Sequence, residues 1–233
     1  MRKKVLSGYV DLKGVLGDEL TVVNAARQSF DAHESFYKKE HREFLQKLID
    51  RKEYHPFRHV LLTFEMKAPF IVMRQIQRYV IGTAQPDTMS AWSEMSLRYM
   101  KKVDKERFYI PKAASWRQAA GKAKDGSSAE CLHFEEGLEL SGDLSDFIDL
   151  SLDLYEKALN KNVAPEMARL FLPVNTLYIT WTMTISLQAL FHMLEERLSP
   201  HAMEETRLYA EVLEYFLHEN LPELHTVWLE RKK

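Results

Sequence analysis

The change of hydrophobic period along the chain is the feature that most constrains its fold. From His59 to Lys67 (HVLLTFEMK) the residues favour a strand, and apolar and polar side chains alternate at the end of this segment. Pro69 follows, and because proline fits the first turn of a helix, residues 70–80 (FIVMRQIQRYV) predict a helix after that strand. A strand followed directly by a helix indicates a fold that contains both kinds of element.

A second alternating segment, residues 93–100 (SEMSLRYM), predicts another strand. Side chains two residues apart share a strand face, so one face presents an acceptor, a hydroxyl and a cation to a single ligand: Glu94, Ser96 and Arg98. The same pattern also fits a solvent-facing strand with an ion pair, and alternation alone leaves both interpretations open. The preceding segment 81–91 (IGTAQPDTMSA) is predicted to be a loop.

The remainder of the chain is predicted to be mainly helical. Apolar spacing, prolines and capping residues predict helices at 36–52, 144–155, 165–173, 182–198 and 199–218. The polar stretch 113–130 (AASWRQAAGKAKDGSSAE) is predicted to be a mobile loop. Strands early and helices late indicate a single α+β domain over residues 1–233.

Charge and hydropathy exclude several classes of function. The net charge of −2 argues against a nucleic-acid partner, because domains that neutralise a phosphate backbone are usually basic. No stretch approaches the roughly 20 apolar residues of a membrane span, so no membrane partner is expected. The start of the chain (MRKKVLSGYVDLKG) has no apolar signal region, which favours the cytoplasm.

Cysteine and histidine positions argue against a metal site. Cys131 is the only cysteine, so there is no internal disulfide and no multi-cysteine metal site. The histidines 55, 59, 192 and 201 lack a compact metal-ligand spacing such as HExxH. The glycine motifs of the common nucleotide-binding folds are also missing.

Several arginines are predicted to lie beside apolar surface, where a guanidinium can bind phosphate or the carbonyls of a planar ligand. They are Arg74, Arg78, Arg98, Arg169 and Arg197. For each arginine taken alone, a solvated or salt-bridged surface position is the simpler interpretation. Only a shared site would favour ligand binding.

Several segments resemble one enzyme family in the family's own order. The runs HPFRHVLLTFEMKAPFIVMRQIQR, SEMSLRYM and RFYIP resemble the flavin-dependent thymidylate synthases, whose signature RHRxxSxNxxSxRY follows a K-A-P-I-x-V-A-R-Q-like segment. AARQSF, ARLFLP and LQALFHMLEERLSPHAMEETRLYA are also similar to the family's stretches. The resemblance extends from about residue 20 to about residue 215.

The resemblance implies a fold, an activity and an assembly. The implied ThyX-like fold packs a mixed or antiparallel sheet with helices and has a helical C-terminal half. The implied reaction is C5 methylation of dUMP to dTMP, with FAD as cofactor and methylenetetrahydrofolate and NADPH as co-substrates. The family forms homotetramers with shared active sites and uses no cysteine nucleophile.

The resemblance also assigns roles to individual residues. The implied nucleotide contacts are Gln75, Arg78, Glu94, Ser96, Leu97 through its backbone, Arg98, Arg169 and Arg197. Of these, Ser96 and Arg197 would take part in catalysis, with Arg197 contacting the uracil ring and helping to activate it. The implied flavin contacts are Ser29, His55, Arg58, Arg78, Tyr79, Glu94, Ser186, Gln188 and His192.

The chain departs from the family pattern mainly on the flavin and folate side. The expected Arg-His-Arg reads Arg78-Tyr79-Val80, and an insertion of about eight residues follows it. Ala91 and Ser93 replace the first serine and the asparagine of the signature, and Ser186 and Gln188 replace an asparagine and an arginine. These departures leave two alternatives: a variant acting on UMP or a related pyrimidine nucleotide, or a nucleotide-binding homologue without catalysis.

Overall fold

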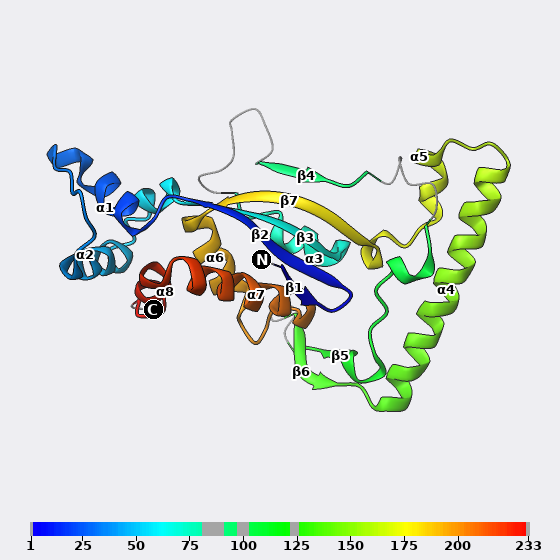
Figure 1. Ribbon diagram of the computed structural model, residues 1–233. Helices are drawn as coiled ribbons and strands as arrows, with labels where there is room; N and C mark the ends of the chain where they lie inside the picture. Colours follow the sequence, from blue (N-terminus) through cyan, green and yellow to red (C-terminus); the bar gives the residue numbers. More distant parts are fainter. Residues whose placement is uncertain (1, 81–90, 97–102, 122–125, 232–233) are drawn as a thin grey trace.

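The centre of the molecule is an antiparallel five-stranded sheet with the strand order β1-β2-β3-β7-β4 (Figure 1). The computed structural model describes residues 2–80, 91–96, 103–121 and 126–231. The strands of the main sheet are β1 (Arg2–Val5), β2 (Gly8–Leu16), β3 (Leu61–Pro69), β4 (Trp92–Glu94) and β7 (Tyr178–Ser186). A separate hairpin pairs β5 (Arg117–Ala119) with β6 (Ser127–Cys131).

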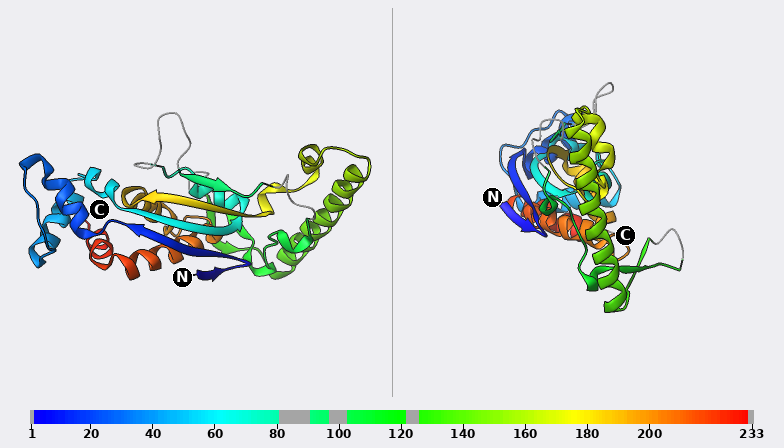
Figure 2. Two further views of the ribbon diagram at one scale, coloured as in Figure 1. Left: turned by 45° about the horizontal axis from the view of Figure 1, so that its top comes forward. Right: turned by 90° about the vertical axis from the view of Figure 1, so that its right-hand side faces the viewer.

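Helices cover one face of the sheet and extend the molecule at both ends (Figures 1 and 2). The α-helices are α1 (Glu19–Arg27), α2 (Lys39–Asp50), α3 (Phe70–Ile76), α4 (Phe134–Asn160), α5 (Pro165–Ala168), α6 (Leu187–Arg197), α7 (Glu204–Asn220) and α8 (Pro222–Leu229). Short 3-10 turns join them: η1 (Gln28–Phe30), η2 (His55–His59), η4 (Lys105–Arg107), η5 (Ala113–Ser115), η7 (Arg169–Phe171) and η8 (Val174–Thr176). This arrangement confirms the predicted α+β class.

The pairing of β3 with β7 runs the full nine residues of each strand, from Leu61 opposite Ser186 to Pro69 opposite Tyr178. Each strand leads directly into a helix, α3 after β3 and α6 after β7. At each junction the first helical amide donates to the carbonyl just before the partner strand. Phe70 N–H donates to Leu177 O, and Leu187 N–H donates to Val60 O, both at 2.9 Å.

The core lies between this sheet and the helices beneath it in Figure 1. Alternate residues of the two central strands are buried and paired across the sheet, with Phe64 opposite Met183 and Met66 opposite Trp181. Helix α7 adds Tyr209 and Phe216, both essentially inaccessible to solvent. Period-two burial on two neighbouring strands produces one apolar face, and the helices bury it.

The opposite face of the sheet is polar. Arg2 and Lys13 form ion pairs with both Asp11 and Glu65 across β1, β2 and β3. Tyr9 O–H donates to Glu65 at 2.9 Å. These contacts hold the pKa of the Glu65 carboxyl below its usual value, with the Tyr9 hydrogen bond as the main cause.

The prediction of a helix at 182–198 is wrong for its first five residues. Thr182 to Ser186 belong to β7, and the helix begins at Leu187. The physical reason is a period of two: threonines at 180, 182 and 184 alternate with buried residues, and β-branched side chains favour the strand. Ser186 then caps α6, since its hydroxyl accepts from Ala189 N–H at 3.2 Å.

Other predicted boundaries also need correction. The predicted loop 113–130 contains the β5–β6 hairpin and the η5 turn, anchored by the Trp116 indole Nε1–H, which donates to Ser141 Oγ at 2.9 Å. The last predicted helix begins at Glu204 rather than at Ser199, because Ser199 Oγ accepts from His201 N–H within a turn. The helix predicted at 70–80 ends at Ile76.

Three helix predictions are confirmed in position and differ in length. Helix α2 spans 39–50 against a predicted 36–52, and α4 spans 134–160 against a predicted 144–155. The segment 165–173 contains α5 and η7. The second predicted strand is found at 92–94, whereas residues 97–100 of it and the loop residues 81–90 lie outside the described residues.

Gly8 gives a direct test of the packing between β2, β3 and α7. A Cβ atom on Gly8 would lie 1.9 Å from Lys67 O and 2.4 Å from the Tyr209 hydroxyl oxygen, which itself donates to Lys67 O at 2.8 Å. Because backbone cannot yield as a side-chain tip can, we expect Gly8→Ala to lower the free energy of unfolding by about 3 kcal/mol or more. Urea unfolding measures this change.

Gly14→Ala is the matched control in the same strand. Nothing lies within 4 Å of a Cβ atom at Gly14, so the substitution should change the free energy of unfolding by no more than about 0.5 kcal/mol. Equal losses for the two variants would contradict the packing described here.

Candidate functional site

The ends of α3 and α6 meet beneath the sheet and bring polar side chains together. Arg197 Nη1 donates to Gln75 Oε1 at 3.4 Å, and Gln75 Nε2 donates to Met203 Sδ at 3.4 Å. Arg197 Nε is buried and has no hydrogen-bond partner among the described residues. A buried guanidinium donor without a partner is costly, which is typical of a group that binds a ligand.

A cavity of about 420 Å³, here called the Arg197 cavity, opens beside this contact. It is lined by Arg78, Tyr79, Val80, Ala189, His192, Glu196 and Arg197. The Tyr79 ring packs edge-on against His192, with ring centroids 5.4 Å apart, and the Arg197 guanidinium lies 5.6 Å from its centre. Burial raises the pKa of the Tyr79 hydroxyl, and the neighbouring Arg197 opposes this shift.

Two guanidinium groups within one cavity suit a planar anionic ligand. Arg78 and Arg197 offer fixed charge and several N–H donors, and Gln75 holds Arg197 from beside the cavity through its own hydrogen bond. The Tyr79 ring provides a flat apolar wall. Such a cavity can hold a phosphate or the carbonyl oxygens of a heterocycle and can stabilise negative charge on them.

A second cavity of about 210 Å³, here called the Trp228 cavity, shares His192 with the first. Its lining residues are Tyr54, Gln188, Phe191, His192, Glu195, Trp228 and Arg231. Arg58 Nε donates to Gln188 Oε1 at 2.6 Å, so two of the predicted flavin contacts bind each other at its edge. His192 therefore lines both the Arg197 cavity and the Trp228 cavity.

The remaining predicted flavin contacts lie on the surrounding turns. Ser29 is exposed on η1, and His55 is exposed at the start of η2. Ser186 is fully buried, and its hydroxyl already accepts the capping hydrogen bond of α6. The Ser186 side chain is therefore the N-cap of α6 in this structure.

The predicted nucleotide-binding strand lies at the sheet edge, apart from these cavities. Glu94 in β4 is opposite Trp181 in β7, and its carboxylate accepts a hydrogen bond from Trp92 Nε1 at 3.2 Å. The Trp92 ring stacks on Trp181 at 5.5 Å, which fixes the strand on the sheet. No described residue of β4 lines either cavity, and Leu97 and Arg98 lie outside the described residues.

Arg169 also lies away from the Arg197 cavity. It stands on η7, which packs with α4, and its Nε is buried without a hydrogen-bond partner in the described part of the chain. The structure thus brings together Gln75, Arg78, Tyr79, His192 and Arg197. Glu94, Ser96 and Arg169 do not line the Arg197 cavity.

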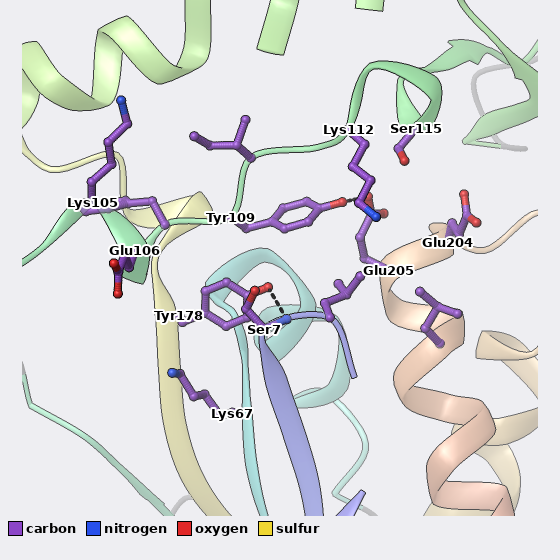
Figure 3. A pocket seen from close by; sticks show the side chains of 14 residues that line it. Ser7, Lys67, Lys105, Glu106, Tyr109, Lys112, Ser115, Tyr178, Glu204 and Glu205 are labelled. Atoms are coloured by element: carbon purple, nitrogen blue, oxygen red, sulfur yellow. Dashed lines mark hydrogen bonds between the residues drawn. The ribbon is translucent and has the colours of Figure 1, made fainter. Parts of the chain in front are cut away.

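A larger cavity of about 1200 Å³ contains none of the predicted site residues (Figure 3). Tyr109 O–H donates to Glu205 at 2.6 Å, and Tyr178 accepts from Ser7 N–H at 3.3 Å. Burial, followed by the Glu205 hydrogen bond, raises the pKa of Tyr109 above its usual value. Tyr109 lies in the run RFYIP, which was singled out only for its resemblance to the family. Nothing in that run predicts a cavity.

The described residues contain neither a metal-binding cluster nor a membrane-spanning helix. Within residues 2–80, 91–96, 103–121 and 126–231, no group of three or more His, Cys, Asp or Glu side chains is arranged to hold a metal ion. Among the helices of the same residues, none is both long enough and apolar enough to cross a membrane.

The sheet and the Arg197 cavity together define an α+β protein with an arginine-lined cavity. The pattern that describes the thymidylate synthase complementing proteins matches residues 12–223 of the chain. The chain therefore belongs to this family, that of the flavin-dependent thymidylate synthases, and the predicted family is confirmed.

Individual relatives agree with this assignment. The chain is 32% identical to the flavin-dependent thymidylate synthase of Thermosipho melanesiensis, over 95% of this chain and 91% of that protein. It is 34% identical to that of Thermus thermophilus, over 92% of this chain and 73% of that protein. The UMP/dUMP methylase PolB of Streptomyces cacaoi, solved with 5-Br dUMP, superposes with a TM-score of 0.79 at 25% identity, covering 97% of each chain. The predicted ThyX-like fold is confirmed.

Proposed function

We propose that this chain catalyses the flavin-dependent methylation of dUMP at C5, giving dTMP, and that it does so as a single domain over residues 1–233. The observation that carries the proposal is the Arg197 cavity of a member of this family, which Arg78 and Arg197 line and where Gln75 binds Arg197. The names of the relatives and the 5-Br dUMP bound to PolB support the choice of substrate.

The residues present fit a flavin. Arg78, Gln188 and His192 offer donors to carbonyl and phosphate oxygens, the Tyr79 ring offers a flat wall, and Arg197 Nε is a buried donor that lacks a partner among the described residues. We infer that the flavin is FAD, with NADPH as reductant and methylenetetrahydrofolate as one-carbon donor. The bound reduced flavin supplies the hydride that the new methyl group requires.

The side chains of the site bind, orient and stabilise. Arg78 holds phosphate, and Gln75 fixes the Arg197 guanidinium beside the uracil carbonyls. As the ring is activated, negative charge grows on a carbonyl oxygen and Arg197 stabilises it. Ser96 contributes a hydroxyl to the substrate without being ionised. Cys131 lies in β6 and lines none of the three cavities described above, so no thiol attacks the ring.

The alternatives are less favoured. Relatives at 32% and 34% identity carry the thymidylate synthase name, which favours dUMP methylation over use of UMP or loss of catalysis. A direct comparison of dUMP with UMP as substrate tests the same point.

The activity has a direct assay. Purified protein should bind FAD and should release tritium from 5-tritiated dUMP when given NADPH and methylenetetrahydrofolate. Substitution at C5 displaces the tritium, so release that depends on methylenetetrahydrofolate reports on the proposed reaction. No flavin binding at saturating concentrations, or no tritium release by the flavin-loaded protein, would sink the proposal.

Arg197→Ala separates binding from turnover. If this arginine acts mainly as charge develops, kcat should fall by about 100-fold or more, whereas the Kd for dUMP rises only a few-fold. Arg207→Ala is the control, because Arg207 pairs with Glu211 on α7 and lines neither cavity. An equal loss in kcat and in binding would refute the catalytic role.

The enzyme is proposed to act as a homotetramer with shared sites. Helix α4 and the adjoining η7 expose large apolar side chains, among them Phe147 at 53% and Leu150 at 55% of their area. An exposed apolar face of this kind is typical of a protein interface. Glu94 and Arg169 lie apart from the Arg197 cavity, so a neighbouring copy is needed to bring them to it.

Phe147→Glu combined with Leu150→Glu tests the interface. We expect the variant to elute as a smaller species in light-scattering chromatography and to lose activity while its helix content is kept, because two buried charges destabilise an interface strongly. Leu16→Glu is the matched control: Leu16 is 65% exposed at the end of β2. A variant that remains tetrameric would contradict the proposed interface.

A further inference from the structure

The turn between α6 and α7 places Met203 against the carboxamide that contacts Arg197. Helix α6 ends at Arg197, α7 begins at Glu204, and residues 198–203 join the two helices. Met203 Sδ accepts from Gln75 Nε2 at 3.4 Å, while Gln75 Oε1 accepts from Arg197 Nη1 at the same distance. The Gln75 carboxamide therefore lies between a sulfur atom and a guanidinium.

The two neighbours of this carboxamide have opposite hydrogen-bonding properties. A thioether sulfur carries no proton and can only accept, whereas a guanidinium can only donate. In the observed orientation Nε2 faces the acceptor and Oε1 faces the donor. Turning the amide over would place two donors against each other and an oxygen against the sulfur. The sulfur and the guanidinium together therefore select one orientation of Gln75.

Methionine is an unexpected residue for this position in α7. Met203 is the N-cap of the helix, and its side chain makes no capping hydrogen bond. Serine, threonine, aspartate and asparagine are preferred at an N-cap, because their side-chain oxygens accept from the first helical amides and stabilise the helix. Residues that break such a local rule are expected mainly at functional sites. Here the Met203 thioether faces Gln75 instead of the helix amides.

Contacts on both sides of Met203 fix its backbone. The Arg117 guanidinium donates through Nη2 to Ala202 O at 3.1 Å, and Ala202 is buried. Tyr109 O–H donates to Glu205 at 2.6 Å, and Figure 3 shows the tyrosine pointing toward that glutamate. A methionine side chain is flexible, so a backbone that is held at residues 202 and 205 limits how far the sulfur can move.

We propose that Met203 is a positioning residue for the reaction in the Arg197 cavity. Its sulfur orients the Gln75 carboxamide, and the carboxamide holds the Arg197 guanidinium where negative charge develops on the pyrimidine. Met203 lines none of the three cavities described above, so it acts through Gln75 and not by touching the substrate. The inference rests on the proposed methylation and adds a residue to which the resemblance assigns no role.

Met203→Leu removes the acceptor and keeps a side chain of similar volume. We expect kcat, measured by tritium release, to fall about fivefold, the factor of one lost hydrogen bond, while the Kd for dUMP changes less than about twofold. Met73→Leu is the matched control, because Met73 is buried in α3 and lines none of the cavities. This control should leave kcat and Kd within about twofold of the wild type.

A double-mutant cycle distinguishes positioning from packing. If Met203 acts through Gln75, Met203→Leu should lower kcat in the wild-type background and change it by less than about 1.5-fold when Gln75 is already replaced by leucine. If Met203 serves only packing, the two losses are independent, and the same factor of about five persists in the Gln75→Leu background. Single turnovers of the flavin-loaded variants give the four rates.

Four results would overturn the positioning role. They are an unchanged kcat in Met203→Leu, independent losses in the cycle, a loss of dUMP binding as large as the loss in kcat, and an equal fall in kcat for Met73→Leu. In each case the wild-type enzyme still releases tritium from dUMP. Failure of the proposed function would instead leave the wild type inactive, so the two failures are distinguishable.

Discussion

The full-length pairing of β3 with β7 is the constraint on which the site depends. Because the strands are antiparallel, α3 and α6 leave the sheet at opposite ends and return beneath the same face. Their lengths, about 10 and 16 Å at 1.5 Å per residue, together nearly span a nine-residue strand pair of about 30 Å. Their last turns therefore meet under the middle of the sheet, and this meeting places Gln75 against Arg197.

The elements with a strong local period were readable from the sequence, and those without one were not. Strand β3 and helices α2, α4 and α7 lie where their apolar patterns predict them, although their ends differ from the predicted ones. The β1–β2 hairpin was missed, since its turn contains Leu6 at a φ of 52°, a conformation that normally calls for glycine or asparagine and here gives no turn signal. The threonines of β7 were assigned to a helix because the apolar residues of 187–194 extend the helical pattern backwards.

Five of the predicted site residues lie together in the structure, although no local sequence pattern predicts where they meet. Motif resemblance selected Gln75, Arg78, Tyr79, His192 and Arg197, and the structure places these five together. Their meeting depends on the register between strands more than 100 residues apart in sequence, which no local pattern encodes. The same resemblance selected Glu94 and Arg169, which a single chain holds elsewhere. Trp228 in α8 and Arg231 just after that helix carried no motif, and only packing brings them to the Trp228 cavity.

The position of β4 at the sheet edge bears on how this chain diverged. An edge strand is held on one side only, and β4 pairs with β7 over just three residues, supported by the Trp92–Trp181 stack. Lengthening the connection before such a strand adds little closure entropy and disturbs no buried layer. The additional residues that the resemblance implies before β4 precede the strand that the sheet holds least, so their number can change while β3 and β7 keep their register.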